Sequence, residues 1–160
     1  MRIGLGSDHN AFEMKDSLKE YIEELGHEVV DYGCEDSCTE VDYPKVAFDV
    51  ASDINKKKLD RGILVCGTGI GVAIAANKIP GIRAALCHDT YSAERAQKSN
   101  NAQILTMGAK IIGIEPAKQI VKAYLESDFP GGNSARKVQQ IIDKEQELLK
   151  WEDVQHEKAY

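Results

Sequence analysis

The chain has 160 residues, a mass of 17.6 kDa and a formal net charge of −6. Hydrophobic residues make up 42% and charged residues 29% of it, which is typical of a globular chain with its own core and unlike a disordered or membrane-spanning one. Acidic residues outnumber basic ones by 26 to 20, so no overall positive field favours nucleic acid or an anionic membrane. An anionic ligand would therefore need a local site.

The N-terminal residues and the cysteines indicate a cytoplasmic location. Asp8 and His9 follow the first apolar residues before a segment of signal-peptide length can develop. The longest uncharged run, residues 62–77, is short for a bilayer span and is interrupted by glycines. The 4 cysteines are unevenly spaced, which favours free thiols over a disulfide framework.

Strand-like and helix-like segments alternate along the chain. Apolar runs predict five strands, at 2–6, 27–33, 62–67, 82–88 and 102–109. Segments with helical spacing of apolar residues lie between and after them, at 11–25, 45–57, about 70–79, 92–100 and beyond Pro116. This order predicts an α/β fold with a mainly parallel five-stranded sheet covered by helices on both faces.

The C-terminal segment predicts one long charged helix. We assign residues 1–133 to the α/β core, and residues 134–160 to a C-terminal helix and tail of the same domain. The apolar residues of this helix form one stripe: Val138, Ile141, Ile142, Leu148 and Trp151. The stripe can pack on the chain's own domain or on a neighbouring subunit, and helix length alone does not decide between them.

A cysteine followed by spaced glycines stands out in the segment GILVCGTGIGVAIAANK, residues 62–78. In open α/β sheets, ligands bind at the carboxyl ends of strands, and Cys66 is predicted to end the third strand. Glycines allow the backbone to present successive N–H groups to an anion, and the same field favours the thiolate form of the cysteine. From spacing alone, a small cysteine buried in the core is the more common interpretation.

Three familiar glycine-rich loops fit this segment poorly. GTGIGV lacks the third glycine of a dinucleotide fingerprint, although Asp89 lies near the expected acidic position. No GK[ST] follows, which excludes the usual nucleoside-triphosphate loop, and Val72 stands where a cysteine phosphatase needs arginine. A thiolate at this place could instead abstract a proton next to a carbonyl, with N–H donors stabilising the enediolate.

Further polar residues are predicted to lie at the same edge of the sheet. Asp8 and His9 follow the first strand, although Asp8 could simply cap a helix and His9 could be an ordinary surface residue. The sequence DYP at 42–44 could be only a turn, and His88 with Asp89 could supply an acid or cap a loop. Cys34 and Cys38 lack a second pair of ligands at zinc-site spacing, so we predict no metal site.

The motifs GSDH, VDYP, CGTGIGVAIAANKIPGIRAALCHD and NNAQILTMG occur in the order found in one family. Over residues 1 to about 140 the chain resembles the ribose-5-phosphate isomerase B and galactose-6-phosphate isomerase family. The resemblance implies a three-layer, Rossmann-like subunit that isomerises aldose and ketose phosphates without metal or cofactor. It also implies a homodimer or homotetramer in which active sites are shared between subunits, and a role in carbohydrate metabolism such as the pentose phosphate pathway.

The resemblance also implies roles for individual residues. Cys66 matches the family's catalytic base, Thr68 lies beside the reacting carbons, and the anion-stabilising loop comprises Gly67, Gly69, Ile70 and Gly71. Substrate-binding positions are matched by Asp8, His9 and Tyr43, with Asn100 contributed by the other subunit. Phosphate-binding arginines of the family align with Lys110 and Lys137, and the adjacent Arg136 could substitute.

Two departures from the family pattern bear on the substrate. Ser99 stands where a histidine assists ring opening, and serine cannot act as an acid–base catalyst near neutral pH. Asn133 replaces a phosphate-binding arginine, and lysines at 110 and 137 keep charge but lose the bidentate geometry.

These departures leave several functions open. We expect conversion of ribose 5-phosphate to ribulose 5-phosphate. The alternatives are the cysteine-bearing subunit of a galactose-6-phosphate isomerase that needs a histidine-bearing partner, another hexose or tetrose phosphate isomerase, and a degenerate sugar-phosphate-binding subunit. A nucleotide-binding module is disfavoured by the incomplete fingerprint.

Overall fold

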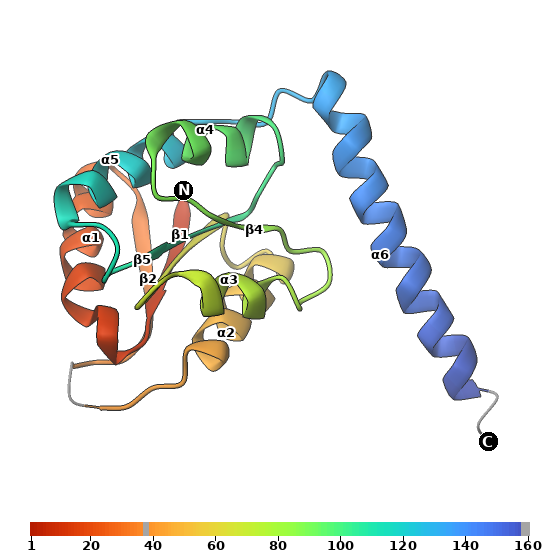
Figure 1. Cartoon of the computed structure of the whole chain (residues 1–160), viewed down its shortest axis with the longest axis horizontal. Helices are drawn as coiled ribbons and strands as arrows, with labels where there is room; N and C mark the ends of the chain where they lie inside the picture. The colour runs from red at the N-terminus through yellow and green to blue at the C-terminus, as the bar shows by residue number, and fades with distance from the viewer. Residues whose placement is uncertain (37–38, 158–160) are drawn as a thin grey trace.

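The computed structural model describes residues 1–36 and 39–157 of the chain. Five strands form a parallel sheet in the order β2-β1-β3-β5-β4 (Figure 1). The strands are β1 (Arg2–Ser7), β2 (Glu28–Gly33), β3 (Arg61–Cys66), β4 (Ala84–Leu86) and β5 (Ile104–Gly108). The α/β class predicted from the alternation of elements is confirmed, and every strand pair in the described sheet is parallel.

Helices cover both faces of the sheet. One core cluster packs α1 (Phe12–Glu24), α4 (Thr90–Lys98) and α5 (Ile114–Leu125) on one face, as Figure 1 shows. A second cluster packs α2 (Tyr43–Asn55) and α3 (Ile70–Ala76) on the other face. The central strands β1 and β3 are buried on both sides, which explains their almost continuous apolar sequences.

Several element boundaries differ from those expected. β4 pairs over only three residues, and α3 has only seven, because it begins after the left-handed Gly69 and ends at Ala76, with Asn77 as its C-cap. The helices α2 and α5 both begin before a proline, at Tyr43 and Ile114. Proline lacks an N–H group and is tolerated in the first helical turn, where that group has no intrahelical partner.

A buried arginine secures the edge of the sheet where the strands begin. The guanidinium of Arg61 donates to the carbonyl of Tyr124 at 2.9 Å, and forms an ion pair with Asp128 at 2.8 Å. These contacts occupy carbonyl groups at the end of α5. They fix the point from which the chain continues towards the last helix.

The last helix, α6 (Asn133–Glu157), extends away from the core in Figure 1. Near its start Val138 is buried, and further along Glu145 accepts a hydrogen bond from the backbone N–H of Gly81 at 2.7 Å. Four large apolar side chains of the helix are exposed: Ile141, Leu148, Leu149 and Trp151. None of the helices in the described part of the chain is both long and apolar enough to cross a membrane.

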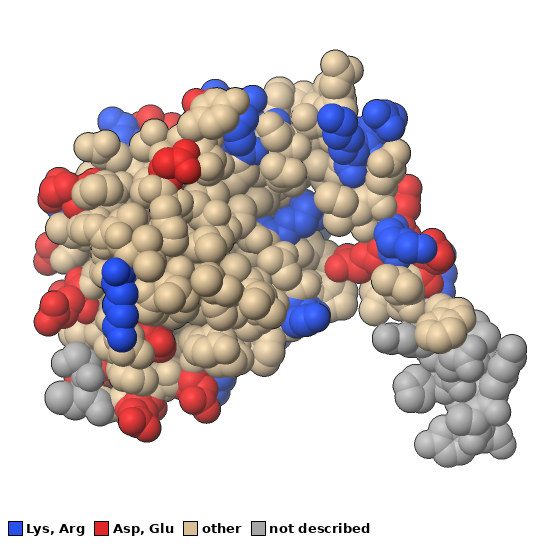
Figure 2. All heavy atoms as spheres, in the orientation of Figure 1, with Lys and Arg blue, Asp and Glu red and all other residues tan. Residues whose placement is uncertain are grey.

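A cavity of about 840 Å³ lies between α6 and the end of α3. Its lining combines apolar and basic side chains, including Ile141, Leu148, Lys78, Lys137 and Lys144. Figure 2 shows Lys and Arg side chains around the hollow between the core and α6, with acidic side chains beside them.

Candidate active site

Cys66 is the last residue of β3 and lies at the carboxyl edge of the sheet. Its side chain is only 5% exposed, and the backbone N–H of Gly69 donates to Sγ at 3.1 Å. Because β1 and β3 are parallel and Ser7 pairs with Val65, the residue after Ser7 lies beside Cys66 at this edge. The cysteine is therefore surrounded by loop backbone and by the end of the neighbouring strand.

Two glycines make the loop after Cys66 possible. Gly69 has φ +76°, and a Cβ placed on it would lie 2.6 Å from the backbone carbonyl carbon of Met107. A Cβ on Gly71 would lie 2.7 Å from the ring of Tyr43. The first glycine therefore permits a left-handed turn packed on β5, and the second permits close approach of the Tyr43 ring.

The carbonyl groups of this loop are directed towards β5 and the turn that follows it. Cys66 O accepts from Ala109 N at 2.9 Å, and Gly67 O accepts from Lys110 N at 3.0 Å. Gly69 O accepts from the hydroxyl of Thr106 at 3.0 Å. With these carbonyls occupied, the N–H groups of Gly69 and Ile70 lie on the side of the Cys66 sulfur and the Thr68 hydroxyl.

Thr68 and Lys110 provide polar groups at the mouth of the loop. The exposed Thr68 hydroxyl accepts a 3.4 Å hydrogen bond from Ile70 N, which leaves its own proton for a ligand. The stem of Lys110 lies along Gly67, with Cδ 3.6 Å from a Cβ placed there. The Lys110 ammonium is exposed and makes no ion pair with the residues whose side chains the structure describes.

Asp8 and His9 lie beside this loop, and both also make structural contacts. Asp8 is buried and caps the short 3-10 turn His9–Ala11 by accepting from Asn10 N at 3.1 Å. His9 Nδ1 accepts from Val41 N at 3.4 Å, which connects the turn to the segment leading into α2. The expected capping role of Asp8 is therefore present, and it places the two side chains next to β3.

His88 accepts a backbone hydrogen bond, and Cys87 is a buried thiol. Leu86 and Thr106 are the last residues that pair between β4 and β5. Two positions beyond each of them, His88 Nε2 accepts a hydrogen bond from Gly108 N at 3.0 Å. Nε2 is therefore occupied as an acceptor and is not free to donate a proton. Burial, with a further contribution from the charge of Asp89, raises the pKa of the Cys87 thiol to about 11, so this thiol is neutral near pH 7.

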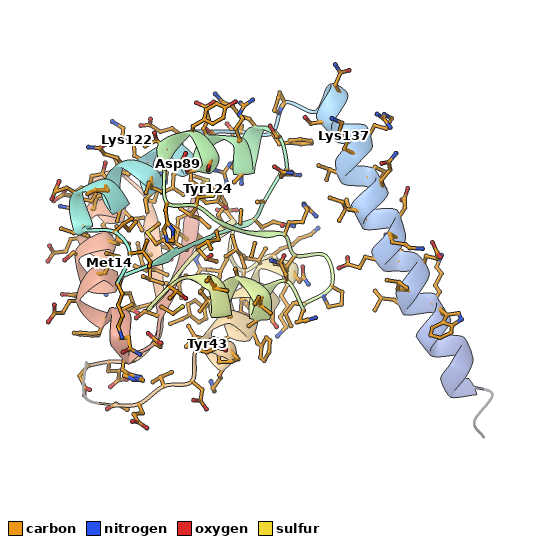
Figure 3. All side chains as sticks on the ribbon, in the orientation of Figure 1. Met14, Tyr43, Asp89, Lys122, Tyr124 and Lys137 are labelled. Atoms are coloured by element: carbon orange, nitrogen blue, oxygen red, sulfur yellow. The ribbon has the colours of Figure 1, made fainter. Side chains whose placement is uncertain are left out.

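Three of the predicted substrate-binding residues lie away from Cys66 in the same chain. Asn100 precedes β5 at the edge where the strands begin, and its carbonyl accepts from Arg83 Nε at 3.1 Å. The length of a strand separates it from Cys66, about 17 Å for five residues. Arg136 and Lys137 lie in the first turns of α6, and Figure 3 shows Lys137 far from Tyr43. Ser99, at the end of α4, lies at the same edge of the sheet as Asn100, where the strands begin.

Sequence reasoning did not single out Thr106 and Gly108. A Cβ on Gly108 would lie 2.6 Å from the backbone of Thr68, so β5 and the loop pack backbone against backbone. The available signal was a single hydroxyl in the buried strand sequence ILTMG, which needs a hydrogen-bond acceptor.

No group of three or more potential metal ligands occurs among the described residues. Cys34 is buried beside Ser7, with 3.7 Å between Sγ and Oγ, and the Lys15 ammonium donates to its carbonyl at 2.8 Å. Cys38, the other cysteine weighed as a ligand, lies outside the described residues.

Comparisons with known proteins agree with this geometry. A family model described as ribose/galactose isomerase matches residues 3–141. The chain is 49% identical over 141 residues to the D-erythrulose-4-phosphate isomerase of Pectobacterium atrosepticum, covering 88% of this chain and 93% of that protein. It is also 49% identical over 138 residues to the ribose-5-P isomerase B of Listeria innocua, with coverage of 86% and 93%.

A solved structure leads to the same assignment. The ribose-5-phosphate isomerase B of Clostridium thermocellum superimposes with a TM-score of 0.89 and 40% sequence identity, covering 92% of this chain and 99% of that one. The match includes the strand that ends in Cys66 and the loop that follows it, because the family model runs through both. The chain therefore belongs to the ribose/galactose isomerase family.

Proposed function

We propose that this chain interconverts aldose and ketose phosphates, with Cys66 as the base. The thiolate takes the proton from the carbon next to the carbonyl of the open-chain sugar, which leaves an enediolate. Return of the proton to the neighbouring carbon gives the isomer, so the reaction needs no external oxidant or reductant. The observation that carries the proposal is the 3.1 Å hydrogen bond from Gly69 N–H to Cys66 Sγ within a loop of N–H donors.

The surrounding residues stabilise charge on the sugar and bind its hydroxyls and phosphate. The Thr68 hydroxyl and the Ile70 N–H are placed to stabilise charge on the sugar oxygens. Asp8, His9 and Tyr43 bind the sugar hydroxyls, and Lys110 supplies positive charge for the phosphate. This division is supported by the position of all six groups around the end of β3.

Replacement of Cys66 by alanine tests the assignment of the base. Loss of a positioned base should lower kcat by about 10² to 10⁴, with KM nearly unchanged. Cys87→Ala is the matched control, because it removes a second buried thiol that we place outside the chemistry. Near-normal turnover by Cys66→Ala would exclude this mechanism. A wild-type chain that binds sugar phosphates without converting any would instead be a binding subunit.

Ser99 favours substrates that are already open-chain. Ribose 5-phosphate is largely cyclic and needs proton transfers to expose its carbonyl, and Ser99 cannot supply them. A four-carbon sugar with its phosphate on O4 has no free hydroxyl with which to close a five-membered ring. We therefore propose that the chain uses ribose 5-phosphate but prefers a tetrose or tetrulose 4-phosphate, the substrate type in the name of the Pectobacterium relative.

A panel of four-, five- and six-carbon sugar phosphates tests this preference. We expect kcat/KM for D-erythrulose 4-phosphate to exceed that for ribose 5-phosphate, and Ser99→His to raise only the ribose value. Equal use of both substrates, unaffected by Ser99→His and by His88→Ala, would contradict it. Activity on galactose 6-phosphate only after addition of a histidine-bearing paralogue would favour the heteromeric alternative.

We also propose that two copies of the chain share each active site. The proposal is supported by the separation of Asn100, Arg136 and Lys137 from Cys66, and by the exposed apolar residues Ile70 and Ile74 beside the loop. The exposed stripe of α6 offers a complementary apolar surface. A subunit that presents its strand-starting edge to the Cys66 edge of another would complete the site, in a homodimer or a homotetramer in the cytoplasm.

Mixing two inactive variants tests the sharing directly. Cys66→Ala and Asn100→Ala homomers should each be nearly inactive. After unfolding and refolding together, mixed dimers hold one intact site, so about a quarter of wild-type activity should return by random pairing. Absence of recovery, with mixed dimers demonstrated by mass spectrometry, would show that each chain works alone.

A further inference from the structure

Thr106 is a fully buried threonine in the otherwise apolar centre of β5. Its hydroxyl donates to the carbonyl of Gly69 at 3.0 Å. The other partner of this carbonyl is Ala73 N at 3.3 Å, the first bond of the short helix α3. The threonine bond is therefore the shorter connection, and it joins the loop to a rigid strand.

Gly69 lies between two peptide groups whose N–H bonds face the reaction site. The preceding peptide carries Gly69 N–H, which donates to Cys66 Sγ at 3.1 Å. The following peptide carries both Gly69 C=O and Ile70 N–H, and in a trans peptide these two bonds point in opposite directions. Holding Gly69 O against Thr106 therefore turns Ile70 N–H away from β5, where it meets Thr68 Oγ1 at 3.4 Å.

This arrangement needs an external restraint because glycine is the most flexible residue in the chain. Gly69 has φ +76°, and glycine adopts other backbone conformations at little cost. Close packing on Met107 limits where the residue lies, but a rotation of either peptide would move an N–H donor away from its target. The Thr106 hydroxyl resists that rotation by fixing the carbonyl.

We propose that Thr106 is a positioning residue for the isomerase reaction, acting through Gly69. The proposal rests on the proposed function for its catalytic consequence and on geometry alone for the restraint. Thr106 makes no contact with substrate. It holds the two N–H groups in the orientation that stabilises the Cys66 thiolate and the enediolate oxygen, so its loss should weaken transition-state stabilisation and leave ground-state binding intact.

A purely structural role would give a different result. A buried hydroxyl bonded to a carbonyl also contributes to stability, and Ser127 makes an equivalent bond to Ala123 O at 2.8 Å at the end of α5. Ser127 lies at the opposite edge of the sheet from Cys66. Ser127→Ala is therefore a matched control that removes the same type of bond without touching the loop.

The test compares Thr106→Val, Thr106→Ser and Ser127→Ala with the wild-type enzyme. In Thr106→Val, amide hydrogen exchange at Gly69 and Ile70 should accelerate about fivefold, the factor equivalent to one net hydrogen bond. Its kcat should fall about tenfold, less than the 10²-fold or greater loss when an oxyanion donor is removed, with KM within about twofold. Thr106→Ser should restore both quantities, and Ser127→Ala should change neither. Thr106→Ala replaces the valine variant if valine fails to fold.

The outcomes separate this proposal from the proposed function. Unchanged exchange at Gly69 and Ile70 overturns the restraint, whatever the activity. Faster exchange with unchanged kcat overturns its catalytic consequence, as does a Thr106→Ser variant as impaired as Thr106→Val. If the wild-type chain isomerises no sugar phosphate while exchange still responds to Thr106→Val, the restraint stands and the proposed function fails.

Discussion

The loop after β3 and the helix α6 are opposite kinds of structure in one chain. The loop is held by backbone contacts with β5 and its turn, and the side chain of Cys66 is almost fully covered. The helix extends from the core, with Ile141 53% and Trp151 63% exposed. Under the proposed function, the groups for proton transfer are built within one subunit, whereas part of the substrate-binding charge comes from a second copy of the chain.

The strongest test of the contrast between the loop and α6 uses two glycines with left-handed backbone conformations, one in each region. Gly69→Ala should lower kcat by about 10²-fold or more, because a Cβ would clash with the backbone of Met107 and displace an N–H donor. Gly131, before α6, has nearly the same φ of +77°, and a Cβ placed on it would have no atom within 4 Å. Gly131→Ala should therefore carry only the conformational cost of about 1 kcal/mol in unfolding free energy and keep kcat within twofold. Similar kinetics in both variants would refute the distinction.

Introducing charged residues into the exposed apolar stripe of α6 tests whether activity depends on assembly. If the proposed oligomer forms through this stripe, Ile141→Asp combined with Leu148→Asp should convert it to monomers in light scattering. Activity should fall about tenfold or more, since an interface core does not tolerate buried unpaired charge. Gln146→Asp, predicted to lie on the opposite side of the helix, is the control and should leave both measurements unchanged. Monomers that retain full activity would show that α6 is dispensable.

Lysines at the two regions should differ in how they affect KM. Lys110→Ala removes an exposed ammonium beside Gly67 and should raise KM about fivefold with kcat nearly unchanged. Lys56→Ala, at the C-cap of α2, is the control for loss of one surface charge. If Lys137→Ala raises KM only in the assembled protein, its charge acts on the site of another subunit. An unchanged KM in Lys110→Ala would remove this lysine from the phosphate site.

The smallest expected effect on kcat comes from replacing Cys87, which distinguishes this buried cysteine from Cys66. Cys87→Ala should lower the free energy of unfolding by about 1 to 2 kcal/mol, because it leaves a small cavity in the core beside α4. Its kcat should remain within about twofold, since the raised pKa keeps this thiol neutral near pH 7. A large loss of kcat in a folded Cys87→Ala protein would mean that the two thiols had been assigned incorrectly.

The fold and half of the site could be predicted from local patterns. The alternation of strands and helices indicated the parallel sheet, and the rule that ligands bind at strand ends brought Asp8, His9 and Cys66 to one edge. The start of α2 at Tyr43 was less evident, because the sequence DYP also fits a turn. The structure places this tyrosine in the first turn of a helix, against Gly71.

The contacts that position the loop could not be read from the sequence. Thr106 and Gly108 lie far from Cys66 along the chain, and only the pairing of β3 with β5 brings them beside it. The limits of α3 and β4 were also overestimated, since apolar residues continue beyond the last hydrogen-bonded pair. Long-range register, and not local propensity, decides these features.

The burial of Cys66 also affects how the protein would respond to oxidation. A thiolate is the form that peroxides attack, and attack requires access to the sulfur. Cys66 is only 5% exposed, and the Gly69 N–H donates to its sulfur. If the sugar binds over the exposed part of this residue, bound substrate shields the thiol. An enzyme saturated with substrate should then survive peroxide that inactivates the empty one, so its redox sensitivity would follow metabolite supply.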